Sequence, residues 1–179
     1  MIFDGYWKDE LKHNVKMMKL WQKLSVHHTT YAEHQINKYI LYSAIVIRKM
    51  IEEEKEAKTD FEKIREKHKA IESSDFHLLK YDIPCMQWNF KGDKDFILHR
   101  VIIDNYKEKG KEINLSHDKI YNAIVHSYIW GLTYSGEANK RRISGFLVSS
   151  DRFKEKILYY VELRDWIDYV NYCIEKSVV

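Results

Sequence analysis

The sequence predicts an α+β fold in which long helices dominate and carry one small antiparallel sheet of two hairpins. Three observations support this prediction. The 179 residues include only one proline and six glycines, too few chain breakers for a sandwich of many short strands. Long segments repeat apolar residues every three or four positions, the period of a helix with one buried face. Shorter segments are rich in β-branched residues and bounded by polar turns, as strands are.

The length fits a single domain over residues 1–179, with a helical part at 1–75 and a mixed part of hairpins and helices at 76–179. Hydrophobic residues make up 45% of the chain and charged residues 32%, which is typical of a globular protein and not of a disordered one. The net charge of +3 is too small to identify a polyanionic partner by itself.

The first part of the chain is predicted to be helical. One helix is expected from about residue 6 to 24, and a second from about 31 to 56. Residues 39–47 are apolar on nearly every side, so the second helix is predicted to be the central helix of the core. The densely charged residues 52–72 are predicted to form a solvated helix or helical connector, with a charged arm that binds a partner as the alternative.

The second part begins with the segment that is hardest to interpret. Pro84 interrupts residues 76–90, which are therefore predicted to be a loop, with a short strand as the alternative. Residues 97–106 are rich in β-branched side chains and are expected to turn into 112–114, forming the first hairpin.

A helix is expected next, from about residue 117 to 130, with Ser116 as its cap and Gly131 at its end. The apolar runs 146–149 and 157–162 are predicted to form the second hairpin. A last helix is predicted from about 164 to 176 by an unbroken apolar stripe. The stripe consists of Leu163, Trp166, Ile167, Val170, Cys173 and Ile174.

The sequence favours a cytoplasmic protein without a membrane partner. Cys85 and Cys173 are far apart in the chain, so neither a disulfide framework nor a cysteine-based zinc site is expected. The N-terminal residues lack the basic start and apolar run of a signal peptide. The most apolar stretch, 39–47, is about half as long as a membrane span requires.

Common catalytic motifs are missing from the sequence. It contains no glycine-rich phosphate loop, no GxSxG, no HExxH and no paired CxxC, so we expect no nucleotide or other cofactor. His27, His28 and His34 cluster with Glu33, but none of the histidines has the i, i+4 spacing that would bring two metal ligands together. We therefore expect no metal site there.

The segment 121–128, Tyr-Asn-Ala-Ile-Val-His-Ser-Tyr, is the best candidate for a functional site. Asn122 and His126 are four residues apart and would share one face of a helix, with Lys119 one turn earlier. A histidine that an amide orients among apolar walls can transfer protons. The alternative is a structural histidine that donates a hydrogen bond to a carbonyl.

This segment resembles the signature of HEPN-domain ribonucleases, a helical family of bacterial toxin–antitoxin and antiphage systems. Asn122, His126 and Tyr128 match its polar, histidine and tyrosine positions within eight residues. The resemblance implies metal-independent RNA cleavage, in which the histidine handles the 2′-OH or leaving-group proton and an arginine stabilises charge on the phosphate. Tyr121 occupies the arginine position and cannot replace a guanidinium. Candidates for another cation are Arg100, Arg141 and Arg142.

Basic residues also gather on the loops around the second predicted hairpin. Together with tyrosines and tryptophans, such residues can bind single-stranded nucleic acid by phosphate attraction and base stacking. The alternative is an ordinary solvated hairpin tip with basic residues guarding a sheet edge. The residues concerned are Arg141, Arg142, Arg152 and Lys154, and Lys119 is also predicted to contact nucleic acid.

Three functions therefore remain open. The first is a non-catalytic binding or accessory module of a bacterial intracellular system, which contacts nucleic acid, a protein partner or a second copy of itself. The second is an RNase-like enzyme built around His126, and the third is a small-molecule enzyme. A catalytic His126 should lie in an open cleft within reach of an arginine, whereas a structural one should be enclosed and hydrogen-bonded to protein.

Overall fold

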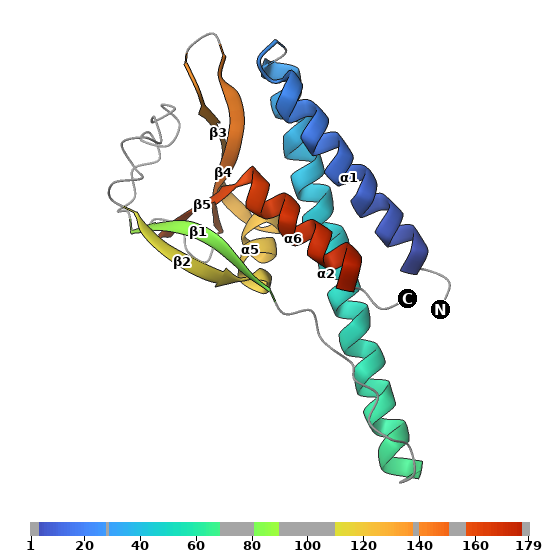
Figure 1. Ribbon diagram of the computed structural model, residues 1–179. Helices are drawn as coiled ribbons and strands as arrows, with labels where there is room; N and C mark the ends of the chain where they lie inside the picture. The colour runs from blue at the N-terminus through green and yellow to red at the C-terminus, as the bar shows by residue number, and fades with distance from the viewer. Residues whose placement is uncertain are drawn as a thin grey trace.

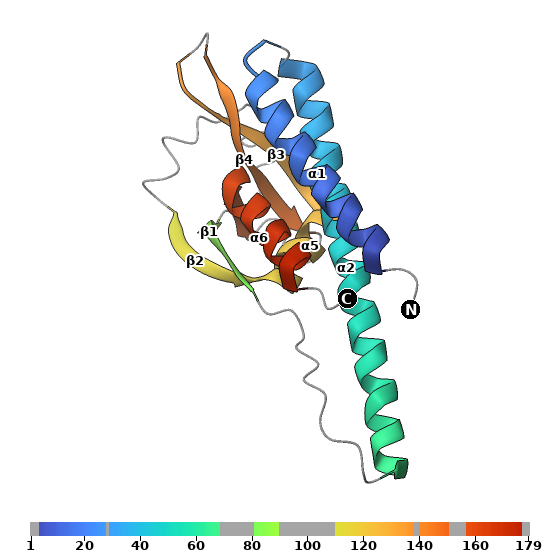
Figure 2. The ribbon, with the colours of Figure 1, turned by 45° about the vertical axis from the view of Figure 1, so that its right-hand side comes forward.

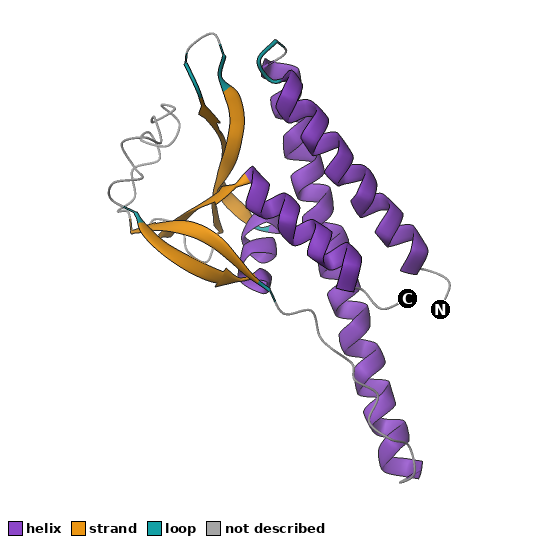
Figure 3. Ribbon diagram, in the orientation of Figure 1, coloured by secondary structure: helices purple, strands orange, loops and turns teal. Residues whose placement is uncertain are grey.

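The computed structural model describes residues 4–27, 29–68, 81–89, 110–137, 140–150 and 157–176. Within these ranges the fold is α+β, as the sequence predicts (Figures 1 and 3). In chain order the elements are α1 (Asp4–Leu24), α2 (Thr29–His68), β1 (Asp82–Asn89), β2 (Lys111–Ser116), α5 (His117–Val125), β3 (Ser127–Ser135), β4 (Arg142–Ser150), β5 (Ile157–Glu162) and α6 (Leu163–Lys176).

The strands form one sheet in the order β2-β1-β5-β4-β3. Each neighbouring pair is antiparallel. The predicted second hairpin is confirmed, because β4 pairs with β5. The sheet nevertheless has five strands, whereas the sequence predicted only two hairpins. The part of the first hairpin placed at 112–114 lies in β2, which pairs with β1. Residues 97–106, predicted to be its other half, lie outside the described residues.

Pro84 lies inside β1, so the short strand given as the alternative is present where a loop was predicted. β1 pairs with β2 from Asp82 to Gln87, with Pro84 opposite Asn114. Its pairing with β5 begins only at Met86. Pro84 therefore lies where one side of β1 has no partner strand, and a strand tolerates a residue without an N–H at such an edge.

The predicted second helix and the charged segment after it form one continuous helix, α2, of 40 residues. No proline or glycine interrupts residues 29–68, and a helix of this length spans about 60 Å. Its C-terminal part extends well beyond the other elements (Figures 1 and 2). Neither α2 nor any other helix in the described ranges combines the length and apolarity needed to cross a membrane.

The main core lies between the helices and one face of the sheet. Ile40 and Ile47 of α2 are fully buried, but Leu41, Tyr42 and Ile45 are exposed, so the core covers only one side of the stretch that the sequence placed at its centre. The last helix is confirmed: Trp166 of α6 has no exposed surface and meets the ring of Phe146 on β4 edge-on at 5.9 Å. Residues that alternate with the core positions of the sheet form a separate small cluster on its other face. These residues are Met86, Trp88, Leu147 and Tyr160.

The predicted helix over 117–130 is shorter than expected, because α5 ends at Val125 and β3 begins at Ser127. Tyr128 therefore lies on a strand, and the prediction that Asn122, His126 and Tyr128 share one helix was wrong. Aromatic and β-branched residues after His126 suit a strand, and β4 supplies the partner along β3. Ser116 occupies the N-cap position of α5, as predicted, but its side chain makes no capping hydrogen bond.

Candidate functional site

His126 lies at the turn between α5 and β3. It is the C-cap residue of α5, and its backbone N–H donates to the carbonyl oxygen of Asn122 at 2.9 Å. The backbone of Asn122, in a half-buried position, thus helps to fix this turn. The side chain of His126 is exposed. His126 is therefore not enclosed, as a structural histidine was expected to be.

An arginine lies beside His126. Nη1 of Arg48 on α2 is 3.3 Å from Nε2 of the imidazole. Nε of the same guanidinium donates to Glu52 Oε1 at 2.8 Å, and Lys49 Nζ donates to Glu52 Oε2 at 3.1 Å. These hydrogen bonds from Arg48 and Lys49 lower the pKa of Glu52. The carboxylate stays ionised and holds the guanidinium at the edge of the histidine ring.

Tyr121, at the arginine position of the HEPN signature, does not take part in this exposed arrangement. Its side chain is buried and meets the ring of His117 edge-on at 6.1 Å. Burial raises the pKa of Tyr121 and the charge of Asp118 adds to this, while the charge of Arg48 acts in the opposite direction. The cation near His126 therefore comes from α2 and not from the residue that the family pattern would use.

Sequence reasoning missed Arg48 because the residue lies within a long apolar helix, 78 positions before its partner. A signal was present in the sequence. Arg48 and Lys49 directly follow Ile45-Val46-Ile47, and cations that interrupt an apolar run mark the boundary where a helix face turns toward solvent. That signal indicates an edge position, but it cannot identify which other element reaches the same edge.

Two contacts fix β3 against α2 and so help to position the turn at His126. Trp130 Nε1 donates to Asn37 Oδ1 at 2.8 Å. Further along the strand, the hydroxyl of Tyr134 donates to Glu33 Oε1. Since His126 directly precedes β3, these anchors restrict its position relative to Arg48.

The other predicted site residues do not all converge on His126. Lys119 is exposed on α5, and Tyr128 is half-buried on β3. Arg141 and Arg142 are exposed, but they lie at the opposite end of the β3–β4 ribbon. Ser127 pairs with Ser150 near His126, whereas Ser135 pairs with Arg142, and these ends are roughly 25 Å apart at the usual rise of a strand.

Arg141 and Arg142 are therefore not the cations that accompany His126, and any nucleic acid they bind would be contacted separately. Arg100, Arg152 and Lys154 lie outside the described residues. Of the clustered histidines, His27 and His34 are exposed, and His28 is likewise outside the described residues. Among the residues that the structure describes, no three His, Cys, Asp or Glu side chains are grouped so that they could hold a metal ion.

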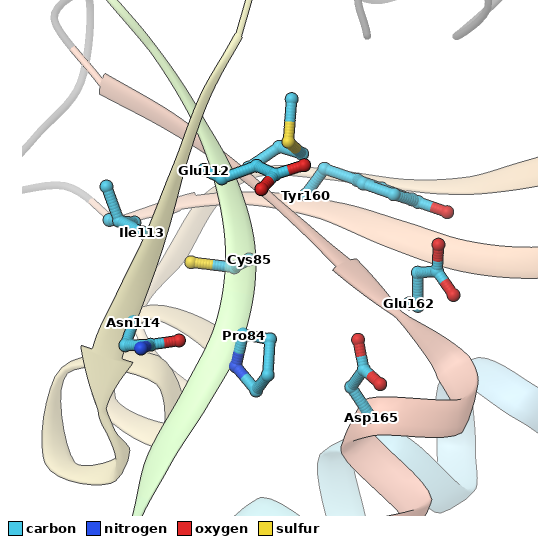
Figure 4. A pocket seen from close by; sticks show the side chains of 9 residues that line it. Pro84, Cys85, Glu112, Ile113, Asn114, Tyr160, Glu162 and Asp165 are labelled. Atoms are coloured by element: carbon cyan, nitrogen blue, oxygen red, sulfur yellow. The ribbon is translucent and has the colours of Figure 1, made fainter.

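A pocket of about 640 Å³ lies elsewhere, where β1, β2, β5 and the start of α6 meet (Figure 4). Pro84 and Tyr160 line it together with three carboxylates, Glu112, Glu162 and Asp165. Burial raises the pKa of Asp165, and the neighbouring charge of Glu162 raises it further. Such an acidic lining repels phosphate groups, so a polyanion would favour the exposed Arg48–His126 pair over this pocket.

Neither a known protein family nor a curated protein or solved structure matches this chain. The chemistry of the Arg48–His126 pair therefore indicates what this surface can bind. Its guanidinium keeps N–H groups that neither Glu52 nor His126 uses. Where Nε2 of the imidazole accepts a hydrogen bond from Arg48, Nδ1 carries the ring proton and is a donor. The pair can thus offer donors from two side chains to one anion.

Proposed function

We propose that the protein is a non-catalytic RNA-binding module, an accessory subunit of a bacterial intracellular system, that holds a backbone phosphate at Arg48 and His126. The observation that carries the proposal is the 3.3 Å contact between these two exposed side chains. A planar guanidinium is well suited to phosphate because its N–H groups can donate in parallel to two oxygens. Lys49 and Lys119, both exposed on the two helices involved, add positive charge that attracts the rest of the strand.

Binding is favoured over catalysis by the state of the two side chains. In the arrangement described, the lone pair of Nε2 faces a guanidinium donor, so this nitrogen is not free to accept a proton from a 2′-OH. The guanidinium is also held by Glu52 at 2.8 Å, and this negative charge offsets part of the stabilisation that Arg48 could give to a charged transition state. Neither feature prevents the pair from donating hydrogen bonds to a phosphate in its ground state.

RNA cleavage remains a second candidate, because His126 is exposed and an arginine is in reach. In that reaction the 2′-oxygen would attack the adjacent phosphorus while His126 accepts the hydroxyl proton. The bond from phosphorus to the 5′-oxygen would break, and this oxygen would take a proton from water. The products would be a 2′,3′-cyclic phosphate and a 5′-hydroxyl. His126 would first have to turn Nε2 away from Arg48, or use Nδ1 as the base.

The proposal is tested by measuring the affinity of single-stranded RNA by fluorescence anisotropy at low salt. Arg48→Gln should weaken binding about tenfold or more, because a charge-assisted phosphate contact is lost. Arg164→Gln is the matched control, since Arg164 is an exposed arginine that pairs with Glu162 on another part of the surface. Equal affinity of wild type and Arg48→Gln would contradict the proposal.

Analysis of the RNA ends after incubation with a metal chelator separates the two candidates. Binding alone predicts intact RNA with wild type. Cleavage predicts cyclic phosphate ends, and His126→Ala should then lower the rate about 10²–10⁴-fold while the fold survives. Tyr121→Arg is expected to gain no activity, because position 121 is buried and a guanidinium there would have to enter the core.

A further inference from the structure

A second surface runs along the solvent-facing side of α2. Three of its large apolar side chains are exposed, with 40% of Leu41, 48% of Tyr42 and 43% of Ile45 accessible. Their spacing places them on one side of the helix, opposite the fully buried Ile40 and Ile47 that face the core. A contiguous group of large apolar side chains on an exposed helix face is typical of an interaction surface.

We propose that this surface is the interface between two copies of the chain, in which α2 packs antiparallel against α2 of a second copy about a two-fold axis near Ile45. A two-fold interface uses the same patch on both subunits, so the patch must be complementary to itself. In such a packing, a residue a given number of positions before Ile45 faces the residue the same number of positions after it.

The polar side chains along α2 meet this requirement. Lys38 and His34 precede Ile45 by two and three helical turns, whereas Glu52 and Glu56 follow it at the same intervals. Antiparallel packing therefore sets Lys38 against Glu52 of the second copy, and His34 against Glu56. A parallel packing would set Lys38 against Lys38 and Glu52 against Glu52, so like charges would repel.

The residues beside the axis fit as well. Tyr42 lies three positions before Ile45 and Lys49 four positions after it, so Lys49 of the second copy would be only about 1.5 Å from level with Tyr42 and can place its ammonium group over the aromatic ring. The ring already attracts a cation within one chain, since Lys38 Nζ lies 5.8 Å from its centre. Glu52 accepts from Arg48 and Lys49 with one oxygen each, and a carboxylate can accept further donors at both oxygens. The charge pattern thus selects a second copy as the occupant of this surface.

This dimer goes beyond the proposed RNA binding. Its tests contain no RNA, so either proposal can be contradicted while the other holds. The first is the mass of the purified full chain by light scattering. Wild type should show about twice the 21.7 kDa of one chain, and Ile45→Glu, which places two carboxylates at the axis, should show one chain only. Wild type that stays a single chain at about 100 μM would overturn the inference.

Disulfide crosslinking then tests the position of the axis. Under mild oxidation Ile45→Cys should form a linked dimer in high yield. Lys38→Cys is the matched control on the same helix face, because the two copies of this position would lie about 20 Å apart and should not link. A mixture of Lys38→Cys and Glu52→Cys should link the two variants to each other. The natural Cys85 and Cys173 are buried and should not contribute. Equal linking of Ile45→Cys and Lys38→Cys would contradict the antiparallel two-fold arrangement.

Discussion

Nη1 of Arg48 on α2 and Nε2 of His126, the C-cap residue of α5, lie 3.3 Å apart although 78 positions separate the two residues in the chain. The contact exists because α5 ends one residue before His126, so that the chain turns and the imidazole emerges beside α2. Had α5 continued to residue 130, His126 would have been an interior helix residue. The turn between α5 and β3 is therefore what places His126 beside Arg48.

Because β4 and β5 approach closely, replacing Gly145 by alanine should destabilise the protein much more than replacing Gly131. A methyl group on Gly145 would lie 2.3 Å from the carbonyl oxygen of Val161 and 2.6 Å from the ring of Tyr160. Gly145→Ala should therefore destabilise the protein by at least about 1–3 kcal/mol, the usual cost of overpacking. Gly131→Ala is the matched control, because nothing lies within 4 Å of its added methyl group. Urea denaturation of both variants measures the difference, and equal midpoints would show that β4 and β5 are not packed as described.

The burial of Trp166 predicts a second effect on stability. The ring is fully enclosed and contacts Phe146 and Tyr169, whose centres are 5.9 Å and 5.3 Å away. Trp166→Ala should lower the free energy of unfolding by about 3–5 kcal/mol, because neighbouring side chains cannot fill the cavity that the ring leaves. Chemical denaturation followed by circular dichroism provides the value. A cost below about 1 kcal/mol would mean that α6 does not cover the core.

The environment of His117 predicts that stability falls in mild acid. Burial lowers the pKa of His117 below its usual value of 6.5, with Asp118 and Asp82 acting in the opposite direction. The unfolded chain then binds a proton more readily than the folded one, so this contribution is complete above pH 6.5 and is lost as the pH falls from there through the folded pKa. Tyr169 Oη lies 3.2 Å from Nδ1 and contacts the neutral ring.

Thermal melts at pH 7.5 and pH 5.5 test this linkage. Wild type should lose more stability between the two values than His117→Asn, which cannot titrate at this position. Because other groups titrate in the same range, only the difference between the losses of the two proteins reports on His117. An identical loss in both would show that His117 is as accessible in the folded state as in the unfolded one.

The two thiols should react slowly in the native protein. Both cysteines are buried, and burial raises the pKa of Cys85 to about 12. At pH 8 only about 10⁻⁴ of such a thiol is ionised, and the thiolate is the reactive form. A thiol reagent should therefore modify both residues rapidly in denaturant and far more slowly without it. Rapid reaction of the folded protein would place Cys85 at an accessible surface.

The regular helices could be predicted from the sequence because their information is local. The apolar stripe of α6, from Leu163 to Cys173, repeats with the helical period and has no competing interpretation. The α5–β3 boundary could not be predicted in this way. Residues 127–130 suit a strand or a helix, and only their pairing with β4 decides between the two.

The same limit applies to β1 and to the candidate site. Pro84 is tolerated in a strand only because pairing with β5 begins two residues later, which depends on tertiary structure. His126 could be singled out from its local pattern, but Arg48 could not be assigned to it. Their proximity depends on how α2 packs along α5, and no spacing within either segment encodes that contact.

A double-mutant cycle on RNA affinity shows whether Arg48 and His126 bind one phosphate together. If Arg48 and His126 hold the same phosphate, Arg48→Gln and His126→Gln should each weaken binding, and the double variant should lose clearly less than the two losses combined. The dependence of affinity on salt should also become shallower in Arg48→Gln, by about one phosphate contact. Wild-type affinity and salt dependence in both single variants would contradict the account.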